Sequence, residues 1–273
     1  MTPENPSDPD VQRLELARGQ GFFTEEGEGP PLVLIHGIPG SERDFRWFCA
    51  AIGPEFRCLR LVIPGFGGAP LETMPYPRLM ARAGYVIEAL EALQVEDALI
   101  LGHSMGGAVA AGAVALQPDR FRGLGLLASV GFRPHRSFRS FRFATPLSLA
   151  MRTPLLKNRL MPRVRAESER VGFKGHDDVA LAQMIHTVAS FSFAQHEKNL
   201  TGIELPTLVA WAEDDRFIEP AISKELYWRC PKGPRIEFPE GGHNIQKSRA
   251  IELAASVTAW SKQLYDGEPE AAS

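Results

Sequence analysis

Cysteine is scarce in this chain, as are long apolar runs and any marked excess of one charge. The 273 residues include three cysteines, Cys49, Cys58 and Cys230, and none has the close spacing of a metal site. We therefore expect buried, reduced thiols in a cytoplasmic protein without disulfides. No apolar run approaches the roughly 20 residues that span a bilayer. A formal net charge of −3 gives no indication of a nucleic-acid partner.

The first ten residues also lack the features of a secretory signal. They are acidic and rich in proline, whereas a signal has a basic start followed by an apolar stretch. We expect residues 1–10 to form a disordered lead-in and residues 266–273 a disordered tail. The remaining length and the 44% hydrophobic content suit one soluble α/β domain, with or without an insertion.

Short, mostly apolar runs recur along the chain, and most are followed closely by glycine or proline. These runs cover residues 32–35, 58–63, 98–101, 124–128 and 207–211. Such runs are typical of strands buried on both faces of a parallel sheet. The helical patterns among them cover residues 82–93, 105–116 and 251–264. The alternation predicts an α/β fold with a doubly wound, mostly parallel sheet, and residues 11–17 and 21–24 predict two earlier strands.

Residues 132–203 interrupt this alternation. They contain no convincing strand, only helix-like patterns broken by prolines, and the segment is too long for a loop between two core strands. We therefore predict an inserted helical subdomain that divides the core into residues 11–131 and 204–265. The insertion holds 12 lysines and arginines against five acidic residues, a charge of +7.

One glycine-rich turn carries a candidate nucleophile. Gly102, His103, Ser104, Met105 and Gly106 match the pattern G-x-S-x-G between a predicted strand and a predicted helix. A sharp strand-to-helix turn of this kind lifts the serine hydroxyl clear of the sheet, and glycines are needed where the backbone is crowded. The helix N-terminus also favours developing negative charge. We interpret Ser104 as the attacking group.

With this turn in place, residues 11–264 resemble the α/β-hydrolase fold family, in its serine-nucleophile, esterase- and lipase-like branch with a helical cap. The segment from His36 to Gly40 resembles the family's H-G-x-P-G turn. The resemblance implies an oxyanion hole formed by the backbone N–H groups of Ile38 and Met105. As a purely structural feature, the same segment is a tight turn braced by His36. The two interpretations are compatible.

Two later segments resemble those that carry the family's remaining catalytic residues. Within residues 208–220 the resemblance selects Asp215 as the acid, with Glu213 and Asp214 as less favoured alternatives that face solvent or form the turn. Around His243, the sequence Glu-Gly-Gly-His-Asn resembles the segment that carries the catalytic histidine. The order serine, aspartate, histidine is that of the family. The resemblance implies that His243 is the general base toward Ser104 and that Asp215 orients it.

No cofactor and no metal is expected. Three histidines of the insertion are spaced ten residues apart, which is not a ligand spacing on a helix, and His103 is interpreted as a packing residue. A serine stands where dehalogenases and epoxide hydrolases of this fold carry a nucleophilic aspartate, which argues against those two activities.

The insertion supplies the clues to the substrate. Its first part interleaves phenylalanines with arginines. The arginines either face water and balance the acidic core, which we favour, or they meet an anionic lipid surface or a negatively charged apolar substrate. The candidate substrate-binding residues of the loops and the insertion are His36, Gly37, Trp47, Phe138 and Phe141.

These features predict a hydrolase (EC 3.1.1) that cleaves a small carboxylic ester with a sizeable apolar part through an acyl-enzyme. Two alternatives stay open. One is a C–C bond hydrolase of ring-cleavage products, indicated loosely by Ser41, Phe45 and Trp47 near the H-G-x-P-G turn. The other is a ligand receptor that keeps the hydrolase fold without turnover, although such a receptor would usually have lost a catalytic residue.

Overall fold

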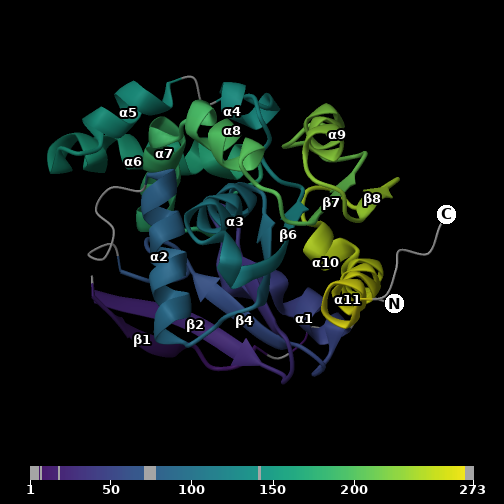
Figure 1. Cartoon of the computed structure of the whole chain (residues 1–273). Coiled ribbons are helices and arrows are strands. Elements are labelled where there is room, and N and C mark those ends of the chain that lie inside the picture. Colours follow the sequence, from purple (N-terminus) through teal and green to yellow (C-terminus); the bar gives the residue numbers. More distant parts are fainter. Residues whose placement is uncertain (1–5, 7, 18, 71–77, 141–142, 268–273) are drawn as a thin grey trace.

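The computed structural model describes residues 6, 8–17, 19–70, 78–140 and 143–267. They form a sheet of eight strands in the order β1-β2-β4-β3-β5-β6-β7-β8, with helices on both faces (Figure 1). The strands are β1 Gln12–Leu16, β2 Gly19–Glu26, β3 Pro31–Ile35, β4 Arg57–Val62, β5 Ala98–His103, β6 Phe121–Leu127, β7 Thr207–Ala212 and β8 Arg235–Phe238. Strands β1, β2 and β4 pair antiparallel, and all later pairs are parallel. The predicted fold class is therefore confirmed.

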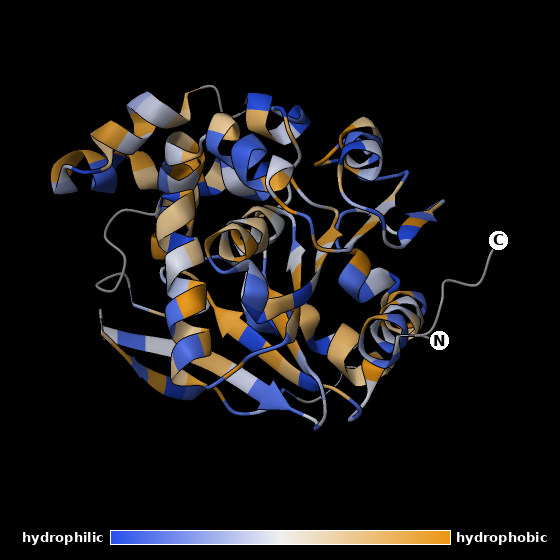
Figure 2. Ribbon diagram, viewed as in Figure 1, coloured by the Kyte–Doolittle hydropathy of each residue, from blue (hydrophilic) through white to orange (hydrophobic). Residues whose placement is uncertain are grey.

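Two apolar layers cover the two faces of the sheet. Side chains alternate along β3, so that Val33 and Ile35 join the cluster around α2 Leu79–Ala92 and α3 Met105–Leu116, while Leu32 and Leu34 face the other way. The second face packs against α1 Arg46–Ile52 and α11 Ala250–Asp266. The hydrophobic residues of the central strands stand out in Figure 2. Apolar burial on both faces explains why these strands are nearly continuous apolar runs.

Strand β8 is the part of the sheet that we did not predict. It is an edge strand of four residues, Arg235 to Phe238, of which only Phe238 is buried. An edge strand that is half exposed contains charged residues and has no apolar run to reveal it. The remaining shorter elements of the core are α9 Pro220–Arg229, α10 Ile245–Ser248 and the 3₁₀ helices η1 Glu42–Phe45 and η2 Pro118–Arg120.

Five helices lie between β6 and β7, above α2 and α3 in Figure 1. They are α4 Arg136–Ser140, α5 Ala144–Ala150, α6 Pro154–Arg170, α7 Asp178–Ser190 and α8 Phe193–Thr201. We call residues 132–203 the cap segment; that it is a separate subdomain stays a prediction. Pro154 begins α6, where a missing N–H is harmless, but Pro162 lies inside the same helix, so that proline does not end it. None of the helices in the described ranges is both long and apolar enough to cross a membrane.

Candidate active site

Ser104 occupies a sharp turn between β5 and α3. Its backbone is in a strained region, with φ 56° and ψ −123°, and it precedes the first residue of α3. Glycines surround it because the backbone leaves no room for a side chain: a Cβ on Gly102 would collide with the carbonyl of Gly106, and one on Gly106 with the carbonyl of Ile35. Steric crowding therefore accounts for the G-x-S-x-G pattern, and the Ser104 side chain stays partly accessible.

A chain of hydrogen bonds joins Ser104, His243 and Asp215. The Ser104 Oγ lies 3.0 Å from His243 Nε2, and His243 Nδ1 lies 2.8 Å from Asp215 Oδ2. Because the carboxylate can only accept, His243 donates through Nδ1–H and its Nε2 accepts the serine proton. Asp215 Oδ1 also accepts from the N–H groups of Phe217 (2.7 Å) and Ile218 (3.1 Å).

The environment of Asp215 keeps this carboxyl ionised. Burial raises the pKa of Asp215, but the hydrogen bond and charge of His243 and the two backbone N–H groups outweigh that effect. The net result is a pKa below the usual value of an aspartate. An anionic Asp215 can therefore hold the His243 ring and stabilise its protonated form.

The loop that carries His243 is held from two further sides. Asp214, the alternative acid, does not contact the His243 ring; its Oδ1 accepts from the N–H groups of Gly241 (2.9 Å) and Gly242 (2.7 Å). His103 donates through Nε2–H to the backbone oxygen of His243 at 2.9 Å. Burial lowers the pKa of His103 to about 3, so the ring is neutral. His103 thus does more than fill space, which the sequence pattern alone did not reveal.

Two backbone N–H groups near Ser104 are available to a ligand. Ile38, in the turn after β3, and Met105, at the first position of α3, both line the pocket beside Ser104. Within the part of the chain that the structure describes, neither N–H donates to a protein acceptor. The first N–H groups of a helix have no partner within it, so Met105 is a ready donor toward an anion. The predicted oxyanion donors are brought together with the candidate nucleophile.

His36 holds the turn of Gly37 and Ile38 in place. Its Nδ1–H donates to the Gly37 oxygen at 2.7 Å, and its Nε2 accepts from the N–H of Ile63 at 3.1 Å. Burial lowers the pKa of His36 to about 4, which keeps the ring neutral as this pair of bonds requires. His36 does not line the pocket, whereas Gly37 does.

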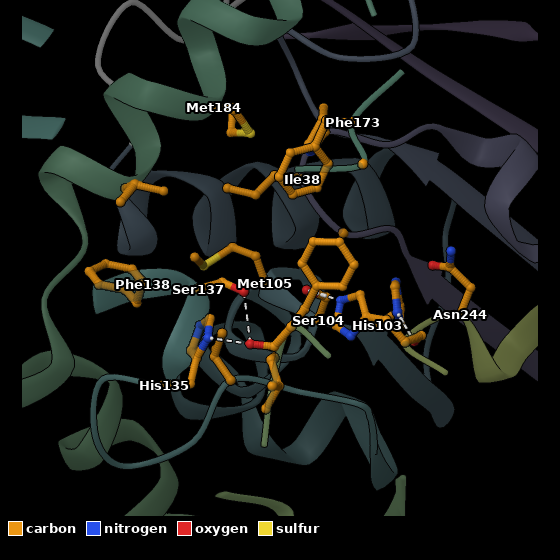
Figure 3. A pocket seen from close by; sticks show the side chains of 18 of the residues that line it. Ile38, His103, Ser104, Met105, His135, Ser137, Phe138, Phe173, Met184 and Asn244 are labelled. Atoms are coloured by element: carbon orange, nitrogen blue, oxygen red, sulfur yellow. Dashed lines mark hydrogen bonds between the residues drawn. The ribbon is translucent and has the colours of Figure 1, made fainter. Parts of the chain in front are cut away.

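A cavity of about 250 Å³ opens beside Ser104. Figure 3 shows the side chains of Phe138, Phe173 and Met184 around it, all from the cap segment. Phe138 was a predicted substrate-binding residue, and its ring packs 4.8 Å from that of Phe193. Phe173 and Met184 were not predicted, because they belong to a loop and a helix without a recognisable motif. The cap segment and the core therefore share the wall of this cavity.

The other predicted substrate-binding residues lie elsewhere. Trp47 is on α1, where its ring stacks against the guanidinium of Arg46 at 3.6 Å and lies 4.2 Å from the Lys247 ammonium. It does not line the cavity beside Ser104. Phe141 lies outside the described residues.

The backbone oxygen of Phe217 ties the cap segment to the loop of Asp215. It accepts from His135 Nδ1–H at 3.2 Å and from Ser137 Oγ at 2.8 Å, both visible in Figure 3. Burial lowers the pKa of His135 to about 4, so this ring too is neutral. The Phe217 ring lies 5.2 Å from that of His243. Only the position of Phe217 two residues after Asp215 signalled its place in the site.

Among the described residues, no group of three or more histidines, cysteines, aspartates or glutamates could hold a metal ion. The three cysteines are buried and unpaired. Burial raises the pKa of Cys230 to about 11, so this thiol is no nucleophile at neutral pH.

Comparison with known proteins places the chain in a family. A family model described as "Alpha/beta hydrolase family" matches residues 32–256. The chain is 28% identical to the dihydrolipoyllysine-residue acetyltransferase component of an acetoin cleaving system from Pseudomonas putida, over 92% of this chain and 69% of that one. It is 27% identical to lipase 3 of a Moraxella species, over 87% and 80% of the two chains.

A solved structure gives the same fold. An alpha/beta hydrolase fold protein from Burkholderia ambifaria superposes with a TM-score of 0.75 at 21% identity, covering 93% of this chain and 99% of the other. The family model spans most of the chain and includes all the residues of the hydrogen-bonded chain around Ser104. The protein therefore belongs to the alpha/beta hydrolase family.

Proposed function

We propose that the protein is a serine hydrolase that cleaves a carboxylic ester through an acyl-enzyme. The observation that carries the proposal is the continuous hydrogen-bonded chain from Ser104 through His243 to Asp215, with 3.0 and 2.8 Å between its atoms. The lipase relative supports ester chemistry. A serine at the turn, in place of an aspartate, argues for attack by an alkoxide and against direct displacement of a halide.

The geometry supports a two-step reaction. His243 Nε2 takes the proton of Ser104 as Oγ attacks the ester carbonyl carbon, and the N–H groups of Ile38 and Met105 donate to the resulting oxyanion. The protonated His243 then gives this proton to the departing alcohol, and the acyl group stays on Ser104. In the second step His243 takes a proton from water, hydroxide attacks the acyl carbon, and Ser104 regains its proton as the carboxylic acid leaves.

The pocket supports an ester with an apolar part. Its cap side contains the rings of Phe138 and Phe173 and the thioether of Met184, which favour apolar groups, together with the polar side chains of His135, Ser137 and His176. Phe45 and Trp47, on which the likeness to C–C hydrolases rested, do not line it. Carbon–carbon bond cleavage and ligand binding without turnover stay as the competing proposals.

Ion pairs of the cap segment support the interpretation that its arginines balance acidic neighbours. Among the described residues, ion pairs join Arg133 to Glu225, Arg139 to Glu219, Arg165 to Asp178 and Arg170 to Glu167. Two of the partners, Glu219 and Glu225, belong to the core. Contact between the cap segment and an anionic lipid surface stays a prediction.

The test is covalent labelling with a fluorophosphonate probe. We expect the wild type to be labelled and Ser104→Ala to be unlabelled and to lose hydrolysis of a nitrophenyl ester by about 10⁶-fold. Ser137→Ala, which removes a second serine that lines the pocket, is the matched control and should still be labelled. A labelled Ser104→Ala protein, or an unlabelled wild type, would contradict the proposal. Turnover of a vinylogous diketone but not of esters would favour the C–C alternative.

A further inference from the structure

A second cavity, of about 410 Å³, lies mainly among residues of the cap segment, with Phe217 of the core in its wall. Helices α5, α6 and α7 supply much of its lining, and most of the side chains along it are apolar. From these helices come Ala144, Leu147, Leu160, Val164, Met184 and Ile185. Four of these side chains, Ala144, Val164, Met184 and Ile185, are buried, so the cavity has an apolar floor of well-packed side chains.

The second cavity is next to the cavity beside Ser104. The two share four lining residues, Ser137, Phe173, Met184 and Phe217. The Phe217 ring lies 5.4 Å from that of Phe173 and 5.2 Å from that of His243. A single layer of side chains therefore separates the cap cavity from the catalytic histidine. Met184 is a suitable member of such a layer, because its unbranched side chain changes shape easily.

The opposite end of the cap cavity reaches the surface. Phe143 is 63% exposed and Val171 38% exposed, while Val164 and Ile185 in the middle are 9% and 2% exposed. The charged side chains that line the cavity, Arg163 and Glu167, come from exposed positions. Charged groups thus mark the outer rim, and the interior that leads toward Ser104 is mostly apolar, with the hydroxyls of Ser137 and Ser168 as its polar groups.

Size also indicates that the two cavities act together. Ligand pockets usually measure about 300 to 1,000 Å³. The cavity beside Ser104, at about 250 Å³, is smaller than this range and suits only a short acyl group. With the cap cavity of about 410 Å³ added, the space falls within the range.

We propose that the cap cavity binds the unbranched apolar chain of the ester whose carbonyl lies at Ser104. The chain passes between Phe173 and Met184 and extends along α6 and α7 toward the exposed rim. This inference rests on the proposed ester hydrolysis, and it assigns the substrate class: esters with a medium or long alkyl chain. Displacement of water from the aliphatic walls supplies the binding free energy.

The first test is a chain-length series of nitrophenyl esters, from acetate to dodecanoate. A matched series of acetate esters with alcohols of increasing length shows whether the chain belongs to the acid or to the alcohol. Each added methylene that enters the cavity should raise kcat/KM about fourfold, until the cavity is filled. A rise in either series supports the inference; flat profiles in both overturn it.

The second test fills the cavity. Val164→Trp places an indole among the buried side chains of α6, and we expect it to lower the octanoate-to-acetate ratio of kcat/KM at least tenfold. Leu155→Trp, on the same helix but 78% exposed, is the matched control and should keep the wild-type ratio. If Val164→Trp does not fold, Leu160→Phe makes a smaller change at a half-buried position. An unchanged ratio in a folded variant contradicts the inference.

A third measurement does not depend on catalysis. Calorimetry with decanoate and the Ser104→Ala protein should detect binding that Val164→Trp weakens at least tenfold in the same background. If the wild type reacts with the fluorophosphonate and hydrolyses acetate but has no chain preference, the cavity assignment fails and the ester hydrolase stands. If decanoate binds and Val164→Trp weakens it while the probe does not react, the proposed function fails and the chain site stands.

Discussion

The core and the cap segment line the cavity beside Ser104 with chemically different groups. On the core side the groups are backbone N–H donors and side chains with fixed hydrogen bonds, such as Asp215, which accepts from His243, Phe217 and Ile218. On the cap side the apolar groups are rings and a thioether, such as Phe138, Phe173 and Met184, beside His135 and Ser137, which donate to the Phe217 oxygen. One side suits the stabilisation of charge, and the other suits the accommodation of an apolar group.

The core and the cap segment also differ in how closely their backbone segments approach one another. Around Ser104 the backbone segments approach so closely that a Cβ on Gly102 or Gly106 collides with a carbonyl. Such a geometry tolerates few sequences. In the cap segment, Leu149 and Leu155 are 56% and 78% exposed, so many side chains would fit at these positions. The turn around Ser104 therefore allows few substitutions, whereas exposed positions of the cap segment allow many.

After the loss expected for Ser104→Ala, the largest effect is expected from a substitution on the core side of the site. Asp215→Asn should reduce turnover about 10⁴-fold on acetate and octanoate esters alike, because an amide in place of the carboxylate favours the wrong His243 tautomer. Steady-state kinetics on both esters measures it. Asp214→Asn is the control: its loss, about 10²-fold at most, would come only from displacement of the loop that Asp214 holds through Gly241 and Gly242. If the two variants exchange these effects, the acid is Asp214.

The same difference explains what the sequence could predict. Local crowding requires glycine two residues before and two residues after Ser104, so the turn could be predicted from a short segment. Burial on both faces requires apolar residues in the central strands, so these strands could be predicted in the same way. The bond from His103 to the His243 oxygen joins residues 140 positions apart. The cap cavity depends on how α5, α6 and α7 pack, and the edge strand β8 has no apolar pattern. Such features depend on tertiary packing between distant parts of the chain, so they cannot be predicted from any short segment.

The second prediction concerns the junction between core and cap segment. His196 on α8 is fully buried, and its Nε2–H donates to the Val130 oxygen at 3.3 Å, close to the turn of Ser104. Burial lowers the pKa of His196 from 6.5 to about 4. Between these values the unfolded chain binds more protons than the folded one, so this contribution to stability is complete above pH 6.5 and is lost as the pH falls toward 4.

We therefore expect His196→Gln, which keeps a donor but cannot titrate, to be less sensitive to acid. From pH 6.5 to 5 the free energy of unfolding of the wild type should fall by about 2 kcal/mol more than that of the variant. Urea unfolding at both pH values measures this difference. Identical losses in the two proteins would show that His196 is protonated in the folded state as readily as in the unfolded one.

The smallest effect is expected within the cap segment itself. Asp177 caps the N-terminus of α7, where its Oδ1 accepts from the N–H of Ala180 at 2.7 Å. Asp177→Ala should cost about 1 kcal/mol, which lowers Tm by roughly 2–4 °C in a chain of this size, whereas Asp177→Asn keeps an acceptor and most of the stability. Thermal unfolding of the two variants measures the difference, and equal Tm values would contradict the capping role.

Because α7 carries Met184 and Ile185 but no member of the hydrogen-bonded chain around Ser104, the loss of this cap should lower activity on long-chain esters more than activity on acetate. An equal loss on both esters would mean that the cap segment supports the catalytic geometry directly, and the separation of chemistry from selectivity would fail.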